Sequence, residues 1–401
     1  MESAQRTCPV CTGKKVKFLQ TMDFARESHC ILPESYRIVE CNNCGFVYDD
    51  LDADEGLFEQ YYRSCTKYTS SGTGGAGGLT MIDRIRYHKL LKWLSPFLNA
   101  ELIIADVGCG KGGLLRFLRE NGFQNLTGIE PSPGCVEVIR HQLKMDAVCS
   151  DIKSLNSTNQ FELVIVANVL EHVFNLREAV KQLSKIITPN GMIAVEVPDA
   201  SRYALFPHAP YYFFDMEHIN HFDLNSMRNL WSSMGFEVLA EEAETCFPVE
   251  GMENPICRLL VQKKKRQKND GTFGIPKSNT AIPVSQYIEW SQKKAQTLPD
   301  APDTQQKFFL WGCGAYAKWF LRNKLSARPA GIVEVDTKKV GQNVDGCPII
   351  SPEMLMTENS EKTIVMISSV LYEQQIRKQL EKLKWKGQIL SACRPREEQE
   401  Y

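Results

Sequence analysis

The chain has 401 residues, 43% of them hydrophobic, which is enough for two or three packed domains. Its 47 basic and 48 acidic side chains give a formal net charge of -1, so nothing in the charge indicates a polyanionic partner such as nucleic acid. No apolar run approaches the ~20 residues that cross a bilayer. We therefore expect a small-molecule partner and no membrane association.

The fourteen cysteines raise the question of the redox compartment. The first ten residues, "MESAQRTCPV", contain neither the basic nor the apolar region of a signal peptide. We expect reduced thiols and a cytoplasmic location. A monomer and a homodimer both remain possible.

Two C-x-x-C pairs, "CPVC" and "CNNCG", stand in the first part of the chain. Two such turns each aim two sulfurs at one ion, which suits tetrahedral zinc, and neither pair has the thioredoxin-like context of a redox motif. The sequence predicts a zinc-binding N-terminal domain over residues 1–68, with a structural metal that has no open position for water. The predicted ligands are Cys8, Cys11, Cys41 and Cys44, with His29, Cys30 and Cys65 near enough in sequence for ligand exchange.

Residues 69–262 are expected to form the central domain. A glycine-rich loop, "TSSGTGGAGGLT", precedes a helix over residues 81–98. After it, the apolar runs "LIIADVG", "LTGIEP", "FELVIVAN" and "MIAVEVP" alternate with amphipathic helices. This alternation predicts a doubly wound α/β fold with a parallel, Rossmann-like sheet.

The remaining residues are expected to form a linker with a helix (263–304) and a second, smaller Rossmann-like domain (305–401). The basic run "KKKRQK" is more typical of a solvated linker than of a phosphate site. In "LWGCGAYAKWFL", Gly312, Gly314 and Ala317 form a turn after a strand, and the next strand is expected to end at Asp336. Such a turn fits a second cofactor, the nucleotide part of a substrate, or close helix packing.

The central domain has a more informative glycine turn in "LIIADVGCGKGGLLRFL". The strand is expected to end at Asp106, and Gly108, Gly110 and Gly112 bring the first N–H groups of a helix close to a phosphate or carboxylate. Glu130 ends the next strand, where an acid suits the hydroxyls of a ribose, and Asp151 follows the third. A nicotinamide enzyme could share these features.

These residues, with "FELVIVANVLEHV" and "LSKIITPNGMIAVEVP", resemble class I S-adenosylmethionine-dependent methyltransferases over about 140 residues. The resemblance implies that the three glycines surround the methionine part of the cofactor and that Glu130 binds the ribose. Asp151 would approach the adenine amine, and Asn168 to His172 would line the methyl side. Asp106, just before the turn, is a further candidate for cofactor binding.

A second group of candidates lies in "PYYFFDMEHINHFDLNSMRNLW", ahead of a helix expected to begin near Asp223 or Asn225. Glu217, His218 and His221 could provide a proton-transferring histidine and its carboxylate partner. Two histidines three residues apart could also hold a metal, although such pairs are more often hydrogen-bonded within a loop.

The cysteine pairs, the central domain, this loop and the small C-terminal domain together resemble the zinc-containing sugar C-methyltransferases of deoxysugar biosynthesis. That resemblance implies a nucleotide-linked 4-keto sugar, methylated next to its ketone, with His218 as base and Glu217 orienting it. It also implies that the C-terminal domain binds the substrate. Two positions differ from the family: Asp215 stands where a tyrosine is common, and Arg258 lacks the preceding glycine-rich segment.

Two other functions remain as alternatives. The first keeps the methyl donor but moves the methyl group to an oxygen or nitrogen of another small molecule. The second is a zinc-knuckle protein that modifies or binds nucleic acid, against which the near-neutral charge counts.

Overall fold

The computed structural model describes residues 2–64, 77–155, 158, 160–264, 277–302 and 306–394. Its contacts divide the chain into two compact units, each drawn from separated stretches. The first comprises Met1–Phe18, Val39–Arg202 and Ile219–Ile282, and the second comprises Leu19–Ile38, Tyr203–His218 and Pro283–Tyr401. Much of the expected glycine-rich loop and basic linker, and Cys65, lie outside the described residues. The predicted consecutive domain boundaries therefore stay predictions.

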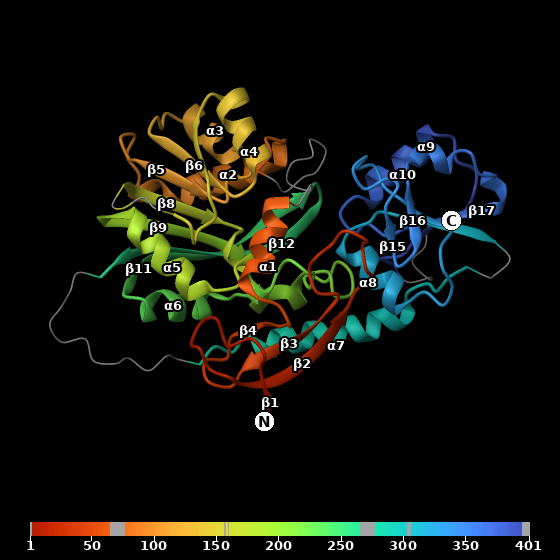
Figure 1. Cartoon of the computed structure of the whole chain (residues 1–401), viewed down its shortest axis with the longest axis horizontal. Coiled ribbons are helices and arrows are strands. Elements are labelled where there is room, and N and C mark those ends of the chain that lie inside the picture. The colour runs from red at the N-terminus through yellow and green to blue at the C-terminus, as the bar shows by residue number, and fades with distance from the viewer. Residues whose placement is uncertain are drawn as a thin grey trace. The chain divides into compact units, whose positions relative to one another are not determined.

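The first unit is built on a seven-stranded sheet in the order β11-β12-β9-β8-β5-β6-β7 (Figure 1). Its strands are β5 (Ile104–Val107), β6 (Leu126–Glu130), β7 (Asp146–Cys149), β8 (Phe161–Ala167), β9 (Ile187–Pro198), β11 (Phe236–Val249) and β12 (Met252–Lys263). The strands from β5 to β9 pair in parallel, as expected, whereas β12 runs antiparallel to both its neighbours.

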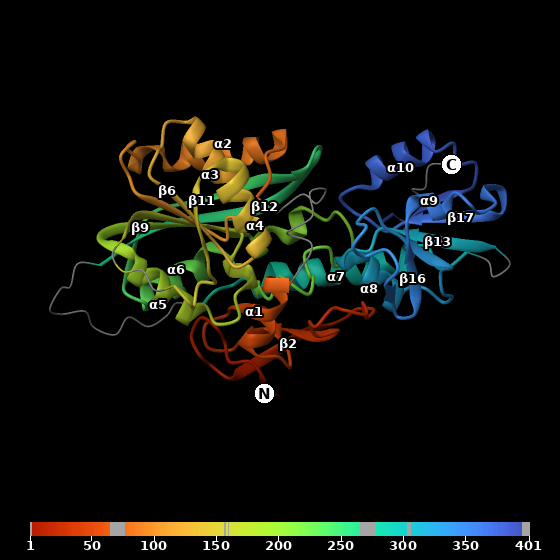
Figure 2. The ribbon, with the colours of Figure 1, turned by 45° about the horizontal axis from the view of Figure 1, so that its top comes forward.

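Helices cover both faces of this sheet (Figure 2). One face carries α2 (Met81–Leu94), α3 (Gly113–Glu120) and α4 (Pro133–Glu137), and the other carries α5 (Leu176–Ile186) and α6 (Leu224–Ser233). Successive side chains of a strand point to opposite faces. Ile104 therefore belongs to the hydrophobic cluster on the α2 and α3 face, and Ala105 belongs to the cluster on the α5 and α6 face. As expected, α6 follows the N-cap Asp223, whose side chain accepts from the Ser226 N–H.

The N-terminal segment adds a five-stranded sheet in the order β1-β2-β3-β4-β10. Its strands are β1 (Glu2–Ser3), β2 (Lys15–Asp23), β3 (Ser35–Cys41), β4 (Val47–Asp50) and β10 (Asn220–His221), and helix α1 (Glu55–Ser64) follows β4. Val10 and Phe46 belong to the core cluster of the α5 and α6 face. The cysteine segment therefore shares the core of the central sheet instead of having one of its own.

The second unit contains a sheet in the order β15-β16-β14-β13-β17-β18, parallel except between β15 and β16. Its elements are α7 (Ala281–Thr297), β13 (Lys307–Trp311), α8 (Ala315–Asn323), β14 (Gly331–Val333), β15 (Asn343–Val344), β16 (Cys347–Ile350), α9 (Pro352–Leu355), β17 (Thr363–Ile367), α10 (Glu373–Lys382) and β18 (Ile389–Ser391). The expectation that the second strand ends at Asp336 is wrong. β14 stops at Val333, and the Glu334 carboxylate accepts the next two backbone N–H groups, which turns the chain.

Two earlier stretches of chain are part of this second unit. Tyr287 on α7 donates its hydroxyl hydrogen to the carbonyl of Ala209 at 2.9 Å. Glu27, from the β2–β3 connection, forms ion pairs with Lys318 and, at 3.3 Å, with Lys339. These contacts fix residues far apart in sequence to one another. Within the described ranges, no helix is long and apolar enough to cross a membrane.

Candidate functional site

The two cysteine pairs form two turns of the same construction. In the first, the Cys8 N–H donates to the Gly13 carbonyl and the Thr12 N–H donates to the Cys8 carbonyl. In the second, Cys41 and Gly45 take the places of Cys8 and Thr12. Thr12 and Gly45 both have positive φ, which turns the chain back after each second cysteine.

All four sulfurs meet within 4.8 Å of one another. The Sγ–Sγ distances are 3.6 Å between Cys8 and Cys44 and 3.5 Å between Cys11 and Cys41. Tetrahedral zinc, with Zn–S bonds of 2.3 Å, has edges of ~3.8 Å, so the donor set fits a structural zinc ion with little rearrangement. No His29 or Cys30 ligand atom belongs to this group.

The glycine turn after β5 is shaped by contacts that exclude side chains. A Cβ at Gly108 would lie 2.4 Å from a methyl carbon of Val169, and a Cβ at Gly112 would lie 2.8 Å from Ile139. Both residues also have positive φ, which a larger residue adopts only with strain. Gly108 faces the cavity described below, whereas Gly112 serves the packing of α3.

Glu130 is the last residue of β6, and its carboxylate connects that strand to the glycine turn after β5. One carboxylate oxygen accepts the Gly110 N–H and the other accepts the Ser132 N–H, both at 2.9 Å. Burial raises the pKa of Glu130, although these two N–H groups oppose the shift. Each oxygen has a second lone pair, so the carboxylate can still accept hydrogen bonds from a ligand.

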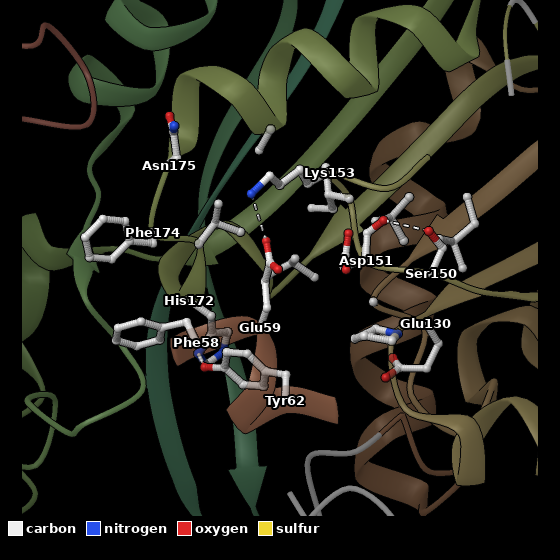
Figure 3. Close-up of a pocket in the computed structure, with 18 of the residues that line it drawn as sticks. Phe58, Glu59, Tyr62, Glu130, Ser150, Asp151, Lys153, His172, Phe174 and Asn175 are labelled. Carbon is white, nitrogen blue, oxygen red and sulfur yellow. Dashed lines mark hydrogen bonds and ion pairs between the residues drawn. The ribbon is translucent and has the colours of Figure 1, made fainter. Parts of the chain in front are cut away.

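Several predicted residues line one cavity of about 180 Å³ in the first unit (Figure 3). Gly108, Glu130, Asp151 and Asn168 all contribute to its wall, as does His172. Asp106, Gly110 and Gly112 are not among its lining residues. The structure thus brings together residues from the ends of four different strands.

Helix α1 supplies a wall of this cavity that the sequence did not predict. Phe58 and Tyr62 line it, together with Glu55 and Glu59. Lys153 lies 3.2 Å from the Glu55 carboxylate and 3.3 Å from that of Glu59. The amphipathic pattern of α1 is too ordinary to signal a binding role.

Asp151 is held by α1 and by its own loop. Its carboxylate accepts from Arg63 and from the Ser154 N–H, both at 2.7 Å. Burial alone would raise the pKa of Asp151, but these hydrogen bonds outweigh it and the pKa lies below its ordinary value. Asp151 therefore stays ionised and available as an acceptor.

Asn168 follows β8 with a φ of 54°. With its amide oxygen turned toward Arg86, that oxygen accepts two N–H groups at 3.0 Å. Arg86 also binds Glu196, which pairs in turn with Arg258 at 2.7 Å. Through Arg86 and Glu196, this network fixes the orientation of the Asn168 side chain. Arg258 is only 1% exposed, so its role is structural.

Tyr62, His172 and Glu171 form a row that the sequence did not reveal as a unit. The Tyr62 hydroxyl lies 3.0 Å from His172 Nδ1, and His172 Nε2 lies 4.0 Å from a Glu171 oxygen. Glu171 is 1% exposed, while Tyr62 and His172 line the cavity (Figure 3). Tyr62 lies 110 residues from His172 in sequence, so no local pattern could pair them.

The loop around His218 belongs to the second unit. The carboxylate beside the imidazole is that of Asp215, with 3.5 Å between Asp215 Oδ2 and His218 Nδ1. The other Asp215 oxygen accepts the N–H groups of Glu217 and His218 at 2.7 Å each. Asp215 therefore holds this loop and faces His218.

His221 is removed from the catalytic candidates by its burial. Its side chain has no exposed surface, and Nε2 lies 3.1 Å from Asp49 Oδ1. His221 belongs to β10, which pairs with β4, so this histidine secures a sheet contact. A group with no exposed atom cannot reach a substrate.

Comparison with known proteins bears on the central region. Residues 82–241 match a family described as a methyltransferase domain. The ubiquinone biosynthesis O-methyltransferase of Rickettsia akari is 30% identical over 139 residues, which is 33% of this chain and 55% of that protein. The malonyl-[acyl-carrier protein] O-methyltransferase of Priestia megaterium is 30% identical over 117 residues, covering 28% and 43% respectively.

The N-methyltransferase NodS of Bradyrhizobium japonicum, solved with S-adenosyl-L-homocysteine, overlaps 51% of this chain and 98% of its own at 16% identity and a TM-score of 0.39. The sequence match and the strand order show that this region has the fold of class I S-adenosylmethionine-dependent methyltransferases. The chain spans about half the length of the curated relatives it matches.

Proposed function

We propose that the protein transfers a methyl group from S-adenosylmethionine to a small molecule. The observation that carries this proposal is the Glu130 carboxylate, only 7% exposed, held by two backbone N–H groups in the wall of the cavity. A carboxylate placed in this way at the end of the second strand suits the two hydroxyls of a ribose.

The other lining residues support the same ligand. Gly108 leaves room for a ligand to approach the backbone, Asp151 provides an ionised acceptor for an adenine amine, and Asn168 is ordered by Arg86. Bound S-adenosylmethionine would supply the methyl group from its sulfonium. The side chains then have to orient the acceptor and remove its proton.

For the acceptor we propose a carbon next to the ketone of a nucleotide-linked sugar. Such a carbon becomes nucleophilic when it loses a proton, and His218 is the proposed base, with Asp215 stabilising the imidazolium that forms. This proposal rests on the family resemblance and on the Asp215–His218 contact. The four-cysteine cluster agrees with it, because that family contains zinc.

The second candidate is O-methylation, which the names of the matched relatives favour. Here the acceptor is a hydroxyl, and His172 would remove its proton. Tyr62 and the buried Glu171 lie on either side of His172, so both ring nitrogens have polar neighbours. Neither candidate requires the metal in the chemical step.

Calorimetric titration with S-adenosylhomocysteine tests the donor site. We expect Glu130→Gln to weaken binding about 10- to 100-fold, since hydrogen bonds to a charged group are each worth about 1.5–3 kcal/mol. Glu137→Gln, an exposed position on α4, is the matched control and should bind like the wild type. Because the pKa of Glu130 is raised, its carboxylate takes up a proton earlier as the pH is lowered. The affinity for S-adenosylhomocysteine should therefore begin to fall while the pH is still above ~4.3, the pKa of an ordinary glutamate. Failure of the folded wild type to bind would contradict the proposed function.

The two acceptors differ in a proton-exchange experiment. With S-adenosylhomocysteine bound and a 4-keto sugar nucleotide in D₂O, C-methylation predicts deuterium uptake next to the ketone. Uptake should be lost in His218→Ala and retained in His172→Ala. No uptake in the wild type would favour the hydroxyl acceptor. Uptake that is lost in His172→Ala alone would keep the carbon acceptor and make His172 the base in place of His218.

A further inference from the structure

Arg6 lies two residues before the first cysteine of the cluster, and its side chain is buried, with 4% of the residue exposed. A buried guanidinium is costly unless its N–H groups are paired. Nη1 donates to the carbonyls of Asp49 and Ile219 at 3.3 and 3.0 Å. Nη2 reaches three further acceptors, two of which belong to the cavity wall.

Those two acceptors are the carbonyls of Val173 and Phe174, at 3.4 and 2.6 Å. The third is the side-chain oxygen of Asn220 at 3.0 Å, and Asn220 itself donates to the carbonyls of Leu170 and Val173. The guanidinium also lies 4.7 Å from the centre of the Phe174 ring. The stretch that carries His172, Val173 and Phe174 is thus fastened at its backbone.

The backbone of Arg6 is fixed from the opposite side. Its N–H donates to Asp50 Oδ1 at 2.8 Å, and its carbonyl accepts from the Tyr48 hydroxyl at 3.0 Å. Tyr48 and Asp50 lie in β4, a few residues after Cys44. The backbone of Arg6 is therefore bound to the segment that follows Cys44, and Arg6 itself precedes Cys8. Its guanidinium group contacts the wall of the cavity.

We propose that Arg6 is a positioning residue that couples metal binding at the four cysteines to binding in the cavity beside Glu130. An ion held by the four sulfurs fixes the two turns and, through them, the backbone of Arg6. The side chain then holds the wall formed by Val173 and Phe174. Coupling of two binding equilibria is reciprocal, so a ligand in the cavity must also raise the affinity of the cysteines for the metal.

This inference rests on the proposed function, because its probe is S-adenosylhomocysteine. Purified protein is analysed for zinc, and its zinc affinity is measured by equilibrium competition with a chelator, with and without S-adenosylhomocysteine. In the wild type we expect one zinc per chain and a zinc affinity raised about tenfold by the ligand, within the usual range of coupling between sites. This measurement needs no variant and so does not depend on the folding of one.

The variant Arg6→Lys keeps the charge but loses the fork that spans several carbonyls. We expect it to bind zinc at full stoichiometry, to bind S-adenosylhomocysteine about tenfold more weakly, and to have a zinc affinity that the ligand no longer changes. The matched control is Arg177→Lys. Arg177 donates to the carbonyl of Val10, inside the first cysteine turn, and to Ser233, but to no residue of the cavity wall.

Arg177→Lys should keep both the affinity and the coupling. If the wild type binds S-adenosylhomocysteine while its zinc affinity is unaffected, the coupling is overturned and the proposed function stands. If the ligand still raises the zinc affinity of Arg6→Lys, Arg6 does not carry the coupling. Absence of zinc overturns the coupling, and absence of ligand binding to the zinc-loaded wild type overturns both proposals.

Discussion

Glu130 and Glu334 perform the same structural task in the two parallel sheets. Glu130 is the last residue of its strand and Glu334 directly follows its strand, and each accepts a backbone N–H from a neighbouring glycine turn, that of Gly110 in one case and of Cys313 in the other. The sequence identified the first acid correctly and chose Asp336 in place of Glu334, because two acids stand close together and only the backbone decides which one closes the strand. An acidic residue at this position is therefore stronger evidence for the end of a strand than for a nucleotide-binding site.

Asp106 shows a second limit of residue-level prediction. The motif marks it as a candidate for cofactor binding, but it is 4% exposed and lies outside the cavity lining. Burial raises the pKa of Asp106 to about 8, although Arg86 opposes the shift. Its carboxyl group is thus protonated in the folded protein at a pH where an unfolded aspartate is ionised.

The stability of the folded state should reflect this difference. Between pH ~4 and pH 8 the folded protein holds one more proton than the unfolded chain at Asp106, so the free energy of unfolding falls as pH rises, by at most ~1.4 kcal/mol per unit. Asp106→Asn removes that loss. Urea unfolding should show the variant gaining stability over the wild type from pH 5 to pH 8, while Asp146→Asn, at an exposed position, shows no such trend. A difference in stability between variant and wild type that stays the same from pH 5 to pH 8 would contradict this assignment.

At the scale of elements, periodicity predicted most of what is present. The helices α2, α6 and α7 and the parallel strands β5, β6, β8 and β9 stand where apolar spacing and turn residues indicated. The direction of β12 was not predictable, because alternation of apolar residues is the same for either strand direction. The role of helix α1 in the cavity wall was likewise not predicted, because it depends on contacts with residues far away in sequence.

Helix α1 is attached to the cavity by exposed ion pairs. We expect Lys153→Met, which keeps the aliphatic stem and loses the pairs with Glu55 and Glu59, to speed dissociation of S-adenosylhomocysteine by up to about fivefold, as is usual for exposed pairs. Added salt should speed dissociation in the wild type and have less effect in the variant. Stopped-flow displacement measures both rates.

Lys181→Ala serves as the comparison, because it breaks an exposed pair with Glu178 on α5 that does not involve α1. Its dissociation rate should equal that of the wild type. Equal rates in Lys153→Met and the wild type would show that these pairs do not hold the helix over the ligand.

At the scale of the whole molecule, the chain order and the spatial grouping differ. Patterns in a sequence are local, so they predicted a zinc segment, a central domain and a C-terminal domain in succession. The contacts group Leu19–Ile38 and Tyr203–His218 in one compact unit with the C-terminal sheet. Tyr203 stacks on Phe213 at 4.2 Å, and this aromatic cluster also includes Tyr287 of α7. Nothing in the short-range spacing of these residues encodes such partners.

This interleaving has a consequence for biosynthesis. The stretch Leu19–Ile38 is synthesised well before β18, which completes its compact unit and ends at Ser391. At ~5–20 residues per second, the wait is roughly 20–70 s. During that time Phe24, Leu32 and Tyr36, each buried in the finished protein, have no completed unit to enter. The nascent chain therefore presents these apolar side chains for far longer than a β-hairpin takes to form, and this stretch is a place where a chaperone would act.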